Sequence, residues 1–231
     1  MQQMPLGVRL QDRAVFASFY AGSNAQAVDW LQRFVRPEGR GAGWLQGAPG
    51  SGKSHLLQAV CAQLPGSGYF PLNELAALGP GVLEGAESLS AVCLDDLQRV
   101  AGDAAWEAAL FRLYVEVDLR GGRLLLAADQ SPAQLPFGLP DLASRYAAAP
   151  LFALHPLDEA QQRDALRLRA QLRGLELPEE TALYLQRRFP RDMATLQGLL
   201  DTLDVASLAE QRRLTLPFIR DVLGSGLPQG E

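Results

Sequence analysis

The sequence predicts an α/β fold in which a parallel sheet is covered by helices on both faces and is followed by a small all-helical domain. Up to Pro156, short apolar runs alternate with segments of helical periodicity, a pattern typical of parallel sheets. Beyond His155 and Pro156 only helical periodicity remains. The 231 residues are 48% hydrophobic and 20% charged, which is enough apolar material for a sizeable core.

Each expected element rests on the spacing of apolar residues and on the Gly and Pro residues that end it. Strands are expected at 44–45, 69–72, 89–94, 123–128 and 150–154. Helices are expected at 24–36, after residue 54, and at 103–119, 158–173, 179–189, 192–209 and 215–223. We expect a flexible N-terminal segment at 1–15, an α/β domain at 16–156, a helical domain at 157–224 and a flexible tail at 225–231.

The composition argues against direct DNA binding and against export. The net charge is −5 and neither half of the chain is basic, whereas a protein that binds duplex DNA normally presents a basic face. Cys61 and Cys93 lie in apolar runs without metal-ligand spacing, so neither a disulfide framework nor a zinc site is supported. No apolar run reaches the roughly 18 residues that cross a bilayer. We expect a cytoplasmic protein with no membrane contact and with a protein as its partner.

The strongest motif is GAPGSGKS at 47–54, which lies between an expected strand and an expected helix. Glycines let backbone amides approach phosphate oxygens, Lys53 would reach the β- and γ-phosphates, and the Ser54 hydroxyl could coordinate Mg²⁺. Lys53 is also the only lysine among the 21 basic residues. The nucleotide-binding residues predicted from this motif are Gly47, Ala48, Pro49, Gly50, Ser51, Gly52, Lys53, Ser54 and the adjacent His55, although a lone histidine at a helix start usually packs there.

Acidic residues follow two of the expected strands. Asp95 and Asp96 end the run 89–94, where Asp95 would hold the metal and Asp96 would orient the attacking water. Asp129 ends the run 123–128 and would lie beside the phosphates, because ligands of open α/β sheets bind at the carboxyl ends of the strands. An acidic turn after a strand is common by itself, and Asp129 could simply cap a loop.

Four segments taken in order resemble the DnaA-related AAA+ proteins, and the last of them resembles the Hda branch of that family. They are GKSHLL at 52–57, CLDDLQRVAG at 93–102, AADQSPAQL at 127–135 and LPDLASRY at 139–146. The resemblance implies a P-loop AAA+ domain with a helical lid, bound to ADP or ATP with Mg²⁺. It also implies that residues in the N-terminal part of the domain flank the adenine, at Phe16, Phe19, Gly22 and Asn24.

The resemblance further implies a negative regulator of replication initiation. Arg145 would be an arginine finger that stimulates hydrolysis of ATP bound to DnaA, while the chain itself hydrolyses ATP weakly or not at all. Family members bind the sliding clamp of DNA polymerase III through a peptide of the form QLxLPL, and DNA is met only through the clamp. The matching residues are Gln3, Met4, Pro5 and Leu6, although the glutamine is out of register.

Three further expectations depend on the same resemblance. The chain ends eight residues after Leu223 and has no globular domain ahead of Phe16, so we expect the Hda plan rather than that of DnaA. Arg191 is the candidate for the second sensor of the lid, with its register open by a few residues. Whether the chain forms a homodimer is left open, as is the choice between ADP and ATP.

Two other functions compete with this interpretation. A replication adaptor of the same fold would recruit DnaA or helicase without stimulating hydrolysis, and a binding assay with DnaA and clamp would separate the two. A small-molecule P-loop kinase is the other rival. No acceptor-pocket pattern supports it, and a lid of four helices disfavours it.

Overall fold

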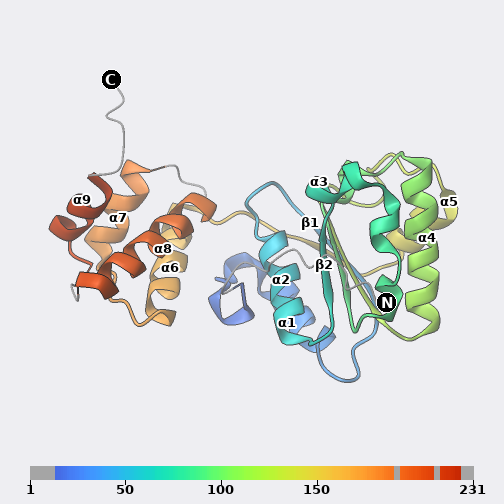
Figure 1. Cartoon of the computed structure of the whole chain (residues 1–231), viewed down its shortest axis with the longest axis horizontal. Helices are drawn as coiled ribbons and strands as arrows, with labels where there is room; N and C mark the ends of the chain where they lie inside the picture. The colour runs from blue at the N-terminus through green and yellow to red at the C-terminus, as the bar shows by residue number, and fades with distance from the viewer. Residues whose placement is uncertain (1–13, 190–192, 211–213, 225–231) are drawn as a thin grey trace. The chain divides into compact units, whose positions relative to one another are not determined.

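The computed structural model describes residues 14–189, 193–210 and 214–224. The chain divides into two compact units, residues 1–156 and 157–231. In the first unit parallel strands form one central sheet (Figure 1). Its five strands follow the order β2-β3-β4-β1-β5. The strands are β1 (Gly41–Gln46), β2 (Gly68–Pro71), β3 (Val92–Asp95), β4 (Arg123–Ala128) and β5 (Leu151–Ala153). The predicted parallel α/β architecture is confirmed.

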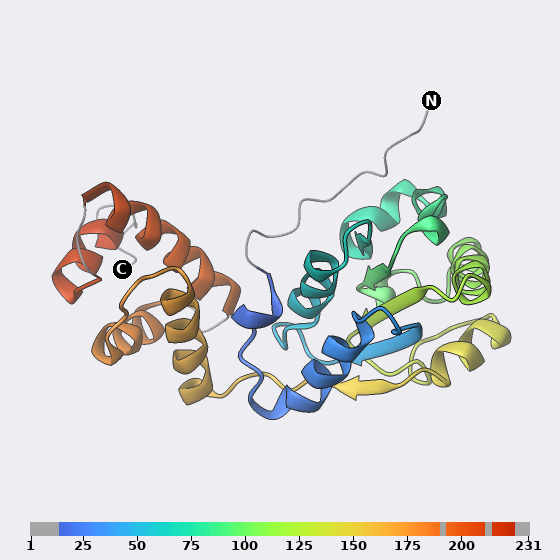
Figure 2. The ribbon, with the colours of Figure 1, turned by 90° about the horizontal axis from the view of Figure 1, so that it is seen from below.

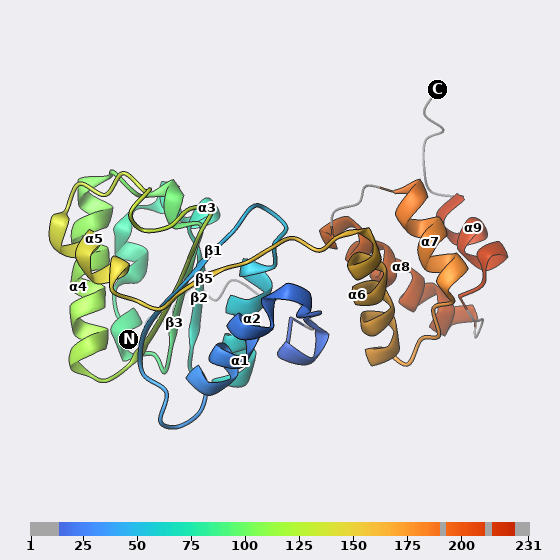
Figure 3. The same cartoon turned by 180° about the vertical axis from the view of Figure 1, so that it is seen from behind.

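Helices cover both faces of this sheet, which explains why its central strands are apolar except at their end residues. On one face lie α1 (Ala25–Phe34) and α2 (Lys53–Gln63), which pack on strand residues such as Leu45 and Leu125. On the other face lie α3 (Leu72–Leu75), α4 (Ala104–Leu119) and α5 (Pro140–Ala147), which pack on residues such as Trp44 and Leu126 (Figure 3). Neighbouring residues of a strand point to opposite faces, so both faces become buried.

Helix α4 is fixed at its start and along its length by acidic side chains. Asp103 is its N-cap, and its carboxylate accepts from the backbone N–H groups of Ala105 (2.9 Å) and Trp106 (3.1 Å). Glu107 is 2% exposed, and its carboxylate accepts from three backbone N–H groups. They belong to Gly102 (2.8 Å), Gly138 (3.0 Å) and Leu139 (2.6 Å). Glu107 therefore ties α4 to the segment that leads into α5.

The segment between β2 and β3 differs from the prediction. The strand expected at 89–94 begins only at Val92, and three short 3₁₀ helices occupy most of 76–88. Ser90 is bound to the loop before β2, from its N–H to Gly66 O (3.1 Å) and from its hydroxyl to Pro65 O (2.8 Å). Helix α5 was also not predicted, although Pro140 at its first turn favours a helix start.

The second unit is helical throughout its described residues (Figure 2). Its helices are α6 (Glu159–Leu172), α7 (Glu179–Arg188), α8 (Met193–Glu210) and α9 (Leu216–Gly224). Leucines from α6, α7 and α8 bury themselves around Phe218 of α9. Asp158 starts α6 with a capping box, since its carboxylate accepts from Gln161 N (2.8 Å) while the Gln161 side chain accepts from Asp158 N (3.1 Å). Within the described part of the chain, no helix is both long and apolar enough to span a membrane.

Candidate functional site

The glycine-rich loop at 47–54 connects β1 to α2 at the carboxyl end of the sheet. Gly50 and Gly52 have φ angles of 79° and 97°, a left-handed conformation that glycine adopts without strain. Gly52 also caps α2, and a Cβ atom there would lie 2.6 Å from the ring of Phe19. The loop therefore holds its backbone close to the start of α2, where unpaired N–H groups attract anions.

Lys53 is the first residue of α2, and its side chain folds back over the loop. Its Nζ atom donates to the carbonyl oxygens of Gly47 (2.6 Å) and Ala48 (3.2 Å). The residue is only 7% exposed. Burial lowers the pKa of Lys53, and the negative charges of Asp95, Asp96 and Asp129 oppose that shift. The predicted phosphate-binding lysine and the three predicted acids thus belong to one electrostatic cluster.

Asp95 ends β3 and is 1% exposed. Its Oδ2 atom accepts from the hydroxyl of Tyr69 (2.8 Å), and its Oδ1 atom accepts from the backbone N–H of Asp96 (3.0 Å). Burial raises the pKa of Asp95, while the neighbouring side chains of Ser54 and Tyr69 lower it. The two residues predicted to hold a metal, Ser54 and Asp95, therefore lie close together.

Gln98 links the ends of β3 and β4. Its Nε2 atom donates to Asp96 Oδ1 (2.9 Å), and its Oε1 atom accepts from the backbone N–H of Asp129 (3.3 Å). Asp96 has a φ angle of 58°, and no other non-glycine residue among those described has a positive φ. Gln98 thus connects two residues of the predicted site. Its position in the sequence indicates nothing of this, because the contact depends on β3 and β4 lying side by side.

The residues at this edge fit a nucleotide phosphate with Mg²⁺. Lys53 is 7% exposed and lies within the electrostatic influence of three acids, and the Ser54 side chain is near the Asp95 carboxylate. The hydroxyl of Ser51 is also buried within the loop, and it has no hydrogen-bond partner among the described residues. A buried hydroxyl without a partner is costly, so a phosphate oxygen within its reach would stabilise the loop.

The N-terminal segment of the domain packs against the start of α2. The rings of Phe19 and His55 lie 5.4 Å apart between centroids, and His55 Nε2 is 3.0 Å from the carbonyl oxygen of Val15. Asn24 pairs with the backbone of His155, donating to its O (2.9 Å) and accepting from its N–H (2.8 Å). His55 and Asn24 therefore hold the segment that was expected to flank the adenine.

Comparisons with known proteins show which family and which solved structures this chain resembles. Residues 158–223 match the family described as "Hda, lid domain". Domain III of the replication initiation protein DnaA from Thermotoga maritima superposes with a TM-score of 0.71 at 22% identity, over 94% of this chain and 98% of that one. AMPPCP-bound DnaA from Aquifex aeolicus gives a TM-score of 0.69 at 20% identity, over 87% of this chain and 68% of that one. RuvB from Thermotoga maritima gives a TM-score of 0.64 at 14% identity, over 94% of this chain and 73% of that one.

The fold of the chain is that of the AAA+ domain of DnaA, and its residues 158–223 match the Hda lid domain family. The AAA+ fold predicted from the four motifs is therefore confirmed, as is a helical lid. The lid family covers most of the second unit, which begins at residue 157. The strand order and the loop at 47–54 belong to the first, AAA+ unit.

Arg145 lies elsewhere on the AAA+ unit, on the exposed side of α5. Its guanidinium carbon is 5.2 Å from the ring centroid of Tyr114 and 5.6 Å from that of Phe111, both on α4. Helices α4 and α5 cover the face of the sheet opposite to α2. Arg145 is thus separated by the sheet from the helix that carries Lys53, and two aromatic rings support it at the surface.

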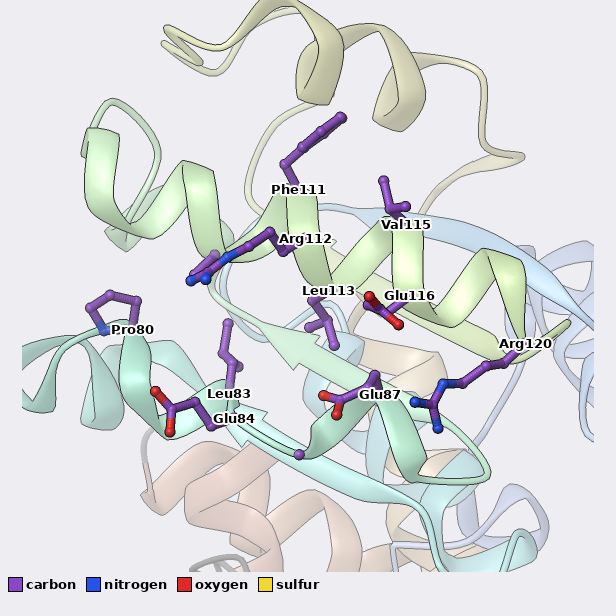
Figure 4. Close-up of a pocket in the computed structure, with 12 residues that line it drawn as sticks. Pro80, Leu83, Glu84, Glu87, Phe111, Arg112, Leu113, Val115, Glu116 and Arg120 are labelled. Atoms are coloured by element: carbon purple, nitrogen blue, oxygen red, sulfur yellow. The ribbon is translucent and has the colours of Figure 1, made fainter.

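A groove of about 650 Å³ opens on the AAA+ unit between α4 and the segment 80–87 (Figure 4). None of the residues predicted for the nucleotide site lines it. Its charged residues are Glu84, Glu87, Arg112, Glu116 and Arg120. The candidate clamp-binding residues Gln3, Met4, Pro5 and Leu6 and the candidate sensor Arg191 lie outside the described residues.

The placement of Lys53 predicts that Lys53→Ala abolishes nucleotide binding. The substitution removes the one side-chain cation of the loop at 47–54, which the motif assigns to the β- and γ-phosphates. Calorimetric titration with ADP should show no binding, while circular dichroism should show a cooperatively folded chain. Tight ADP binding by this variant would overturn the phosphate-loop assignment.

Proposed function

We propose that the chain binds ADP or ATP with Mg²⁺ and acts as a negative regulator of replication initiation that stimulates hydrolysis of ATP on DnaA. The observation that carries the proposal is the position of Arg145, which is exposed on α5 and lies on the face of the sheet opposite to α2. An arginine so placed serves a nucleotide held by another subunit better than its own. The Hda lid family and the DnaA-like fold support DnaA as that subunit.

In the proposed site the phosphates lie over the loop at 47–54. Backbone N–H groups of the loop bind phosphate oxygens, and the Lys53 ammonium group turns from the carbonyls of Gly47 and Ala48 to the β- and γ-phosphates. Ser54 and Asp95 would hold Mg²⁺, which would neutralise phosphate charge. Asp96 would orient a water, and Asp129 would act near the γ-phosphate. The AMPPCP bound to DnaA of Aquifex aeolicus supports an adenine nucleotide as ligand.

The proposed contribution to DnaA is a single guanidinium group. Arg145 would donate to oxygens of the γ-phosphate held by DnaA as negative charge develops on them, and such fingers contribute about 10³ to 10⁵ in rate. The rings of Tyr114 and Phe111 limit the directions that the side chain can take before the complex forms. This preorganisation lowers the entropy that is lost on docking. Little hydrolysis by the chain itself is needed for such a role.

The proposal includes a clamp contact at Gln3, Met4, Pro5 and Leu6. Its support is the sequence similarity of this segment to the family peptide, whose apolar end would fill a groove of the clamp. The acidic net charge of −5 also favours a protein partner, so DNA would be reached only through the clamp.

A second candidate is an adaptor that recruits DnaA without stimulating hydrolysis. The contact of Arg145 with two aromatic rings favours it to a degree, because such a contact can also be purely structural. In that case the surface of α4 and α5 would bind a partner without any role for the charge of Arg145.

Arg145→Ala tests the finger. The variant should bind ADP and unfold cooperatively like the parent, yet it should stimulate hydrolysis of DnaA-bound ATP at least about tenfold less on clamp-loaded DNA. Arg145→Lys should not restore stimulation, because an ammonium group cannot bridge two phosphate oxygens as a planar guanidinium does. Arg112→Ala, at an exposed arginine of α4, is the matched control and should stimulate normally. Full stimulation by Arg145→Ala would instead favour the adaptor.

The clamp contact is tested by deleting residues 2–6. The deletion should abolish co-elution with the clamp, because Leu6 and its neighbours supply the apolar end of the peptide. ADP binding should be unchanged, since the deleted residues precede the folded domain expected from residue 16. Continued co-elution of the shortened chain with the clamp would show that docking occurs elsewhere.

A further inference from the structure

Tyr69 lies in β2, outside both the phosphate loop and the strand that ends in the acid pair. It is in register with Cys93 of β3, and both side chains belong to the cluster under α2. Because the strands are parallel, the long side chain of Tyr69 reaches along β3 to its carboxyl end. Its hydroxyl there donates to Asp95 Oδ2 at 2.8 Å.

The hydroxyl of Tyr69 also lies beside α2. Burial and Asp95 raise the pKa of the Tyr69 phenol, whereas the side chains of Gln58 and Ser54 on α2 lower it. Gln58 is 6% exposed, so these groups meet inside the protein. The phenol donates its one proton to Asp95 and can accept through its oxygen. Tyr69 thus lies where β2, β3 and α2 come together beside Ser54 and Asp95.

The contact fixes the orientation of the Asp95 carboxylate. Asp95 Oδ1 is held by the backbone N–H of Asp96 (3.0 Å), and Oδ2 is held by Tyr69. The donor of Asp96 is a backbone N–H group, so it continues to hold Asp95 Oδ1 whichever residue replaces Tyr69. Without the phenol, Oδ2 would lose this donor, and the plane of the carboxylate would be held less firmly. Ligand orientation by such outer partners typically affects metal affinity 10–100-fold.

A purely structural role accounts less well for these contacts. The core around Tyr69 is otherwise lined by apolar groups such as Leu57, Val60 and Cys93, and a phenylalanine would fill the same volume. Tyr146 shows that this fold does not need its buried phenols to be hydrogen-bonded, because its hydroxyl is buried without a partner within the described chain. The Tyr69 hydroxyl, in contrast, is directed at the carboxylate assigned to the metal.

We propose that Tyr69 is a positioning residue for the metal, which holds the Asp95 carboxylate in the orientation that Ser54 and Asp95 need to bind Mg²⁺ together. This inference rests on the proposed nucleotide site. It adds a residue from a fourth strand, β2, and it makes the Mg²⁺ dependence of nucleotide binding sensitive to a single hydroxyl.

The test is Tyr69→Phe in the full chain, with ADP affinity measured by calorimetry in EDTA and across a Mg²⁺ titration. Affinity in EDTA should equal that of the parent, since the loop at 47–54 is unchanged. The Mg²⁺ concentration that gives half of the full increase in affinity should rise about tenfold or more. Mn²⁺ bound with ADP, followed by its electron paramagnetic resonance spectrum, should show the same loss of occupancy. Tyr146→Phe, which removes a buried hydroxyl without a partner, should change neither quantity.

Each other outcome has a definite meaning. An unchanged Mg²⁺ midpoint in Tyr69→Phe would overturn the proposal while leaving the nucleotide site intact. An equal loss of ADP affinity in EDTA and in Mg²⁺ would also overturn it, because the hydroxyl would then act on the fold of the loop. Absence of ADP binding by the parent protein would instead reject the proposed nucleotide site itself.

Discussion

Lys53 carries a charge although only 7% of the residue is exposed, and neighbouring groups of the AAA+ unit offset the cost of burying that charge. A buried ammonium without partners would cost several kcal/mol or would lose its proton. The loop carbonyls of Gly47 and Ala48 accept its hydrogen bonds, and the carboxylates that follow β3 and β4 offset its charge. An arrangement in which one cation faces three acids suits a site that will exchange some of these contacts for a phosphate and a metal.

The order of the strands explains how these groups meet. Because β4 lies between β1 and β3, the loop after β1, Asp129 after β4 and the acid pair at the end of β3 converge on one edge of the sheet. Tyr69 of β2 and Gln98 then connect these strand ends by hydrogen bonds. On the opposite face Glu107 joins α4 to the segment before α5, and α4 supplies the rings that support Arg145.

The sequence predicts those parts of the site whose residues lie close together along the chain. The loop at 47–54 is recognisable because its glycines, lysine and serine are consecutive, and the acids are recognisable because each follows an apolar strand. Tyr69 and Gln98 could not be found in this way, since their partners are 26 and 31 residues distant and are set by strand pairing. The one indication of Tyr69 in the sequence is that a residue with a hydroxyl group lies in the strand before the one that ends in Asp95. The pairing of Asn24 with His155 spans 131 residues and carries no local pattern. Arg145 was chosen by family resemblance alone, and its aromatic support depends on the packing of α5 on α4.

The central claim is that Lys53 and Asp95 form one buried electrostatic unit, and a double-mutant cycle on unfolding free energy measures this directly. Lys53→Met and Asp95→Asn should each destabilise the protein without nucleotide, because each leaves its partner's charge buried and less compensated. Together they should cost less than the sum of the single effects, by about 0.5–3 kcal/mol. The pair Lys53→Met and Glu116→Gln, in which Glu116 is exposed on α4, provides the additive reference. Additivity within about 0.5 kcal/mol for Lys53 and Asp95 would contradict the account.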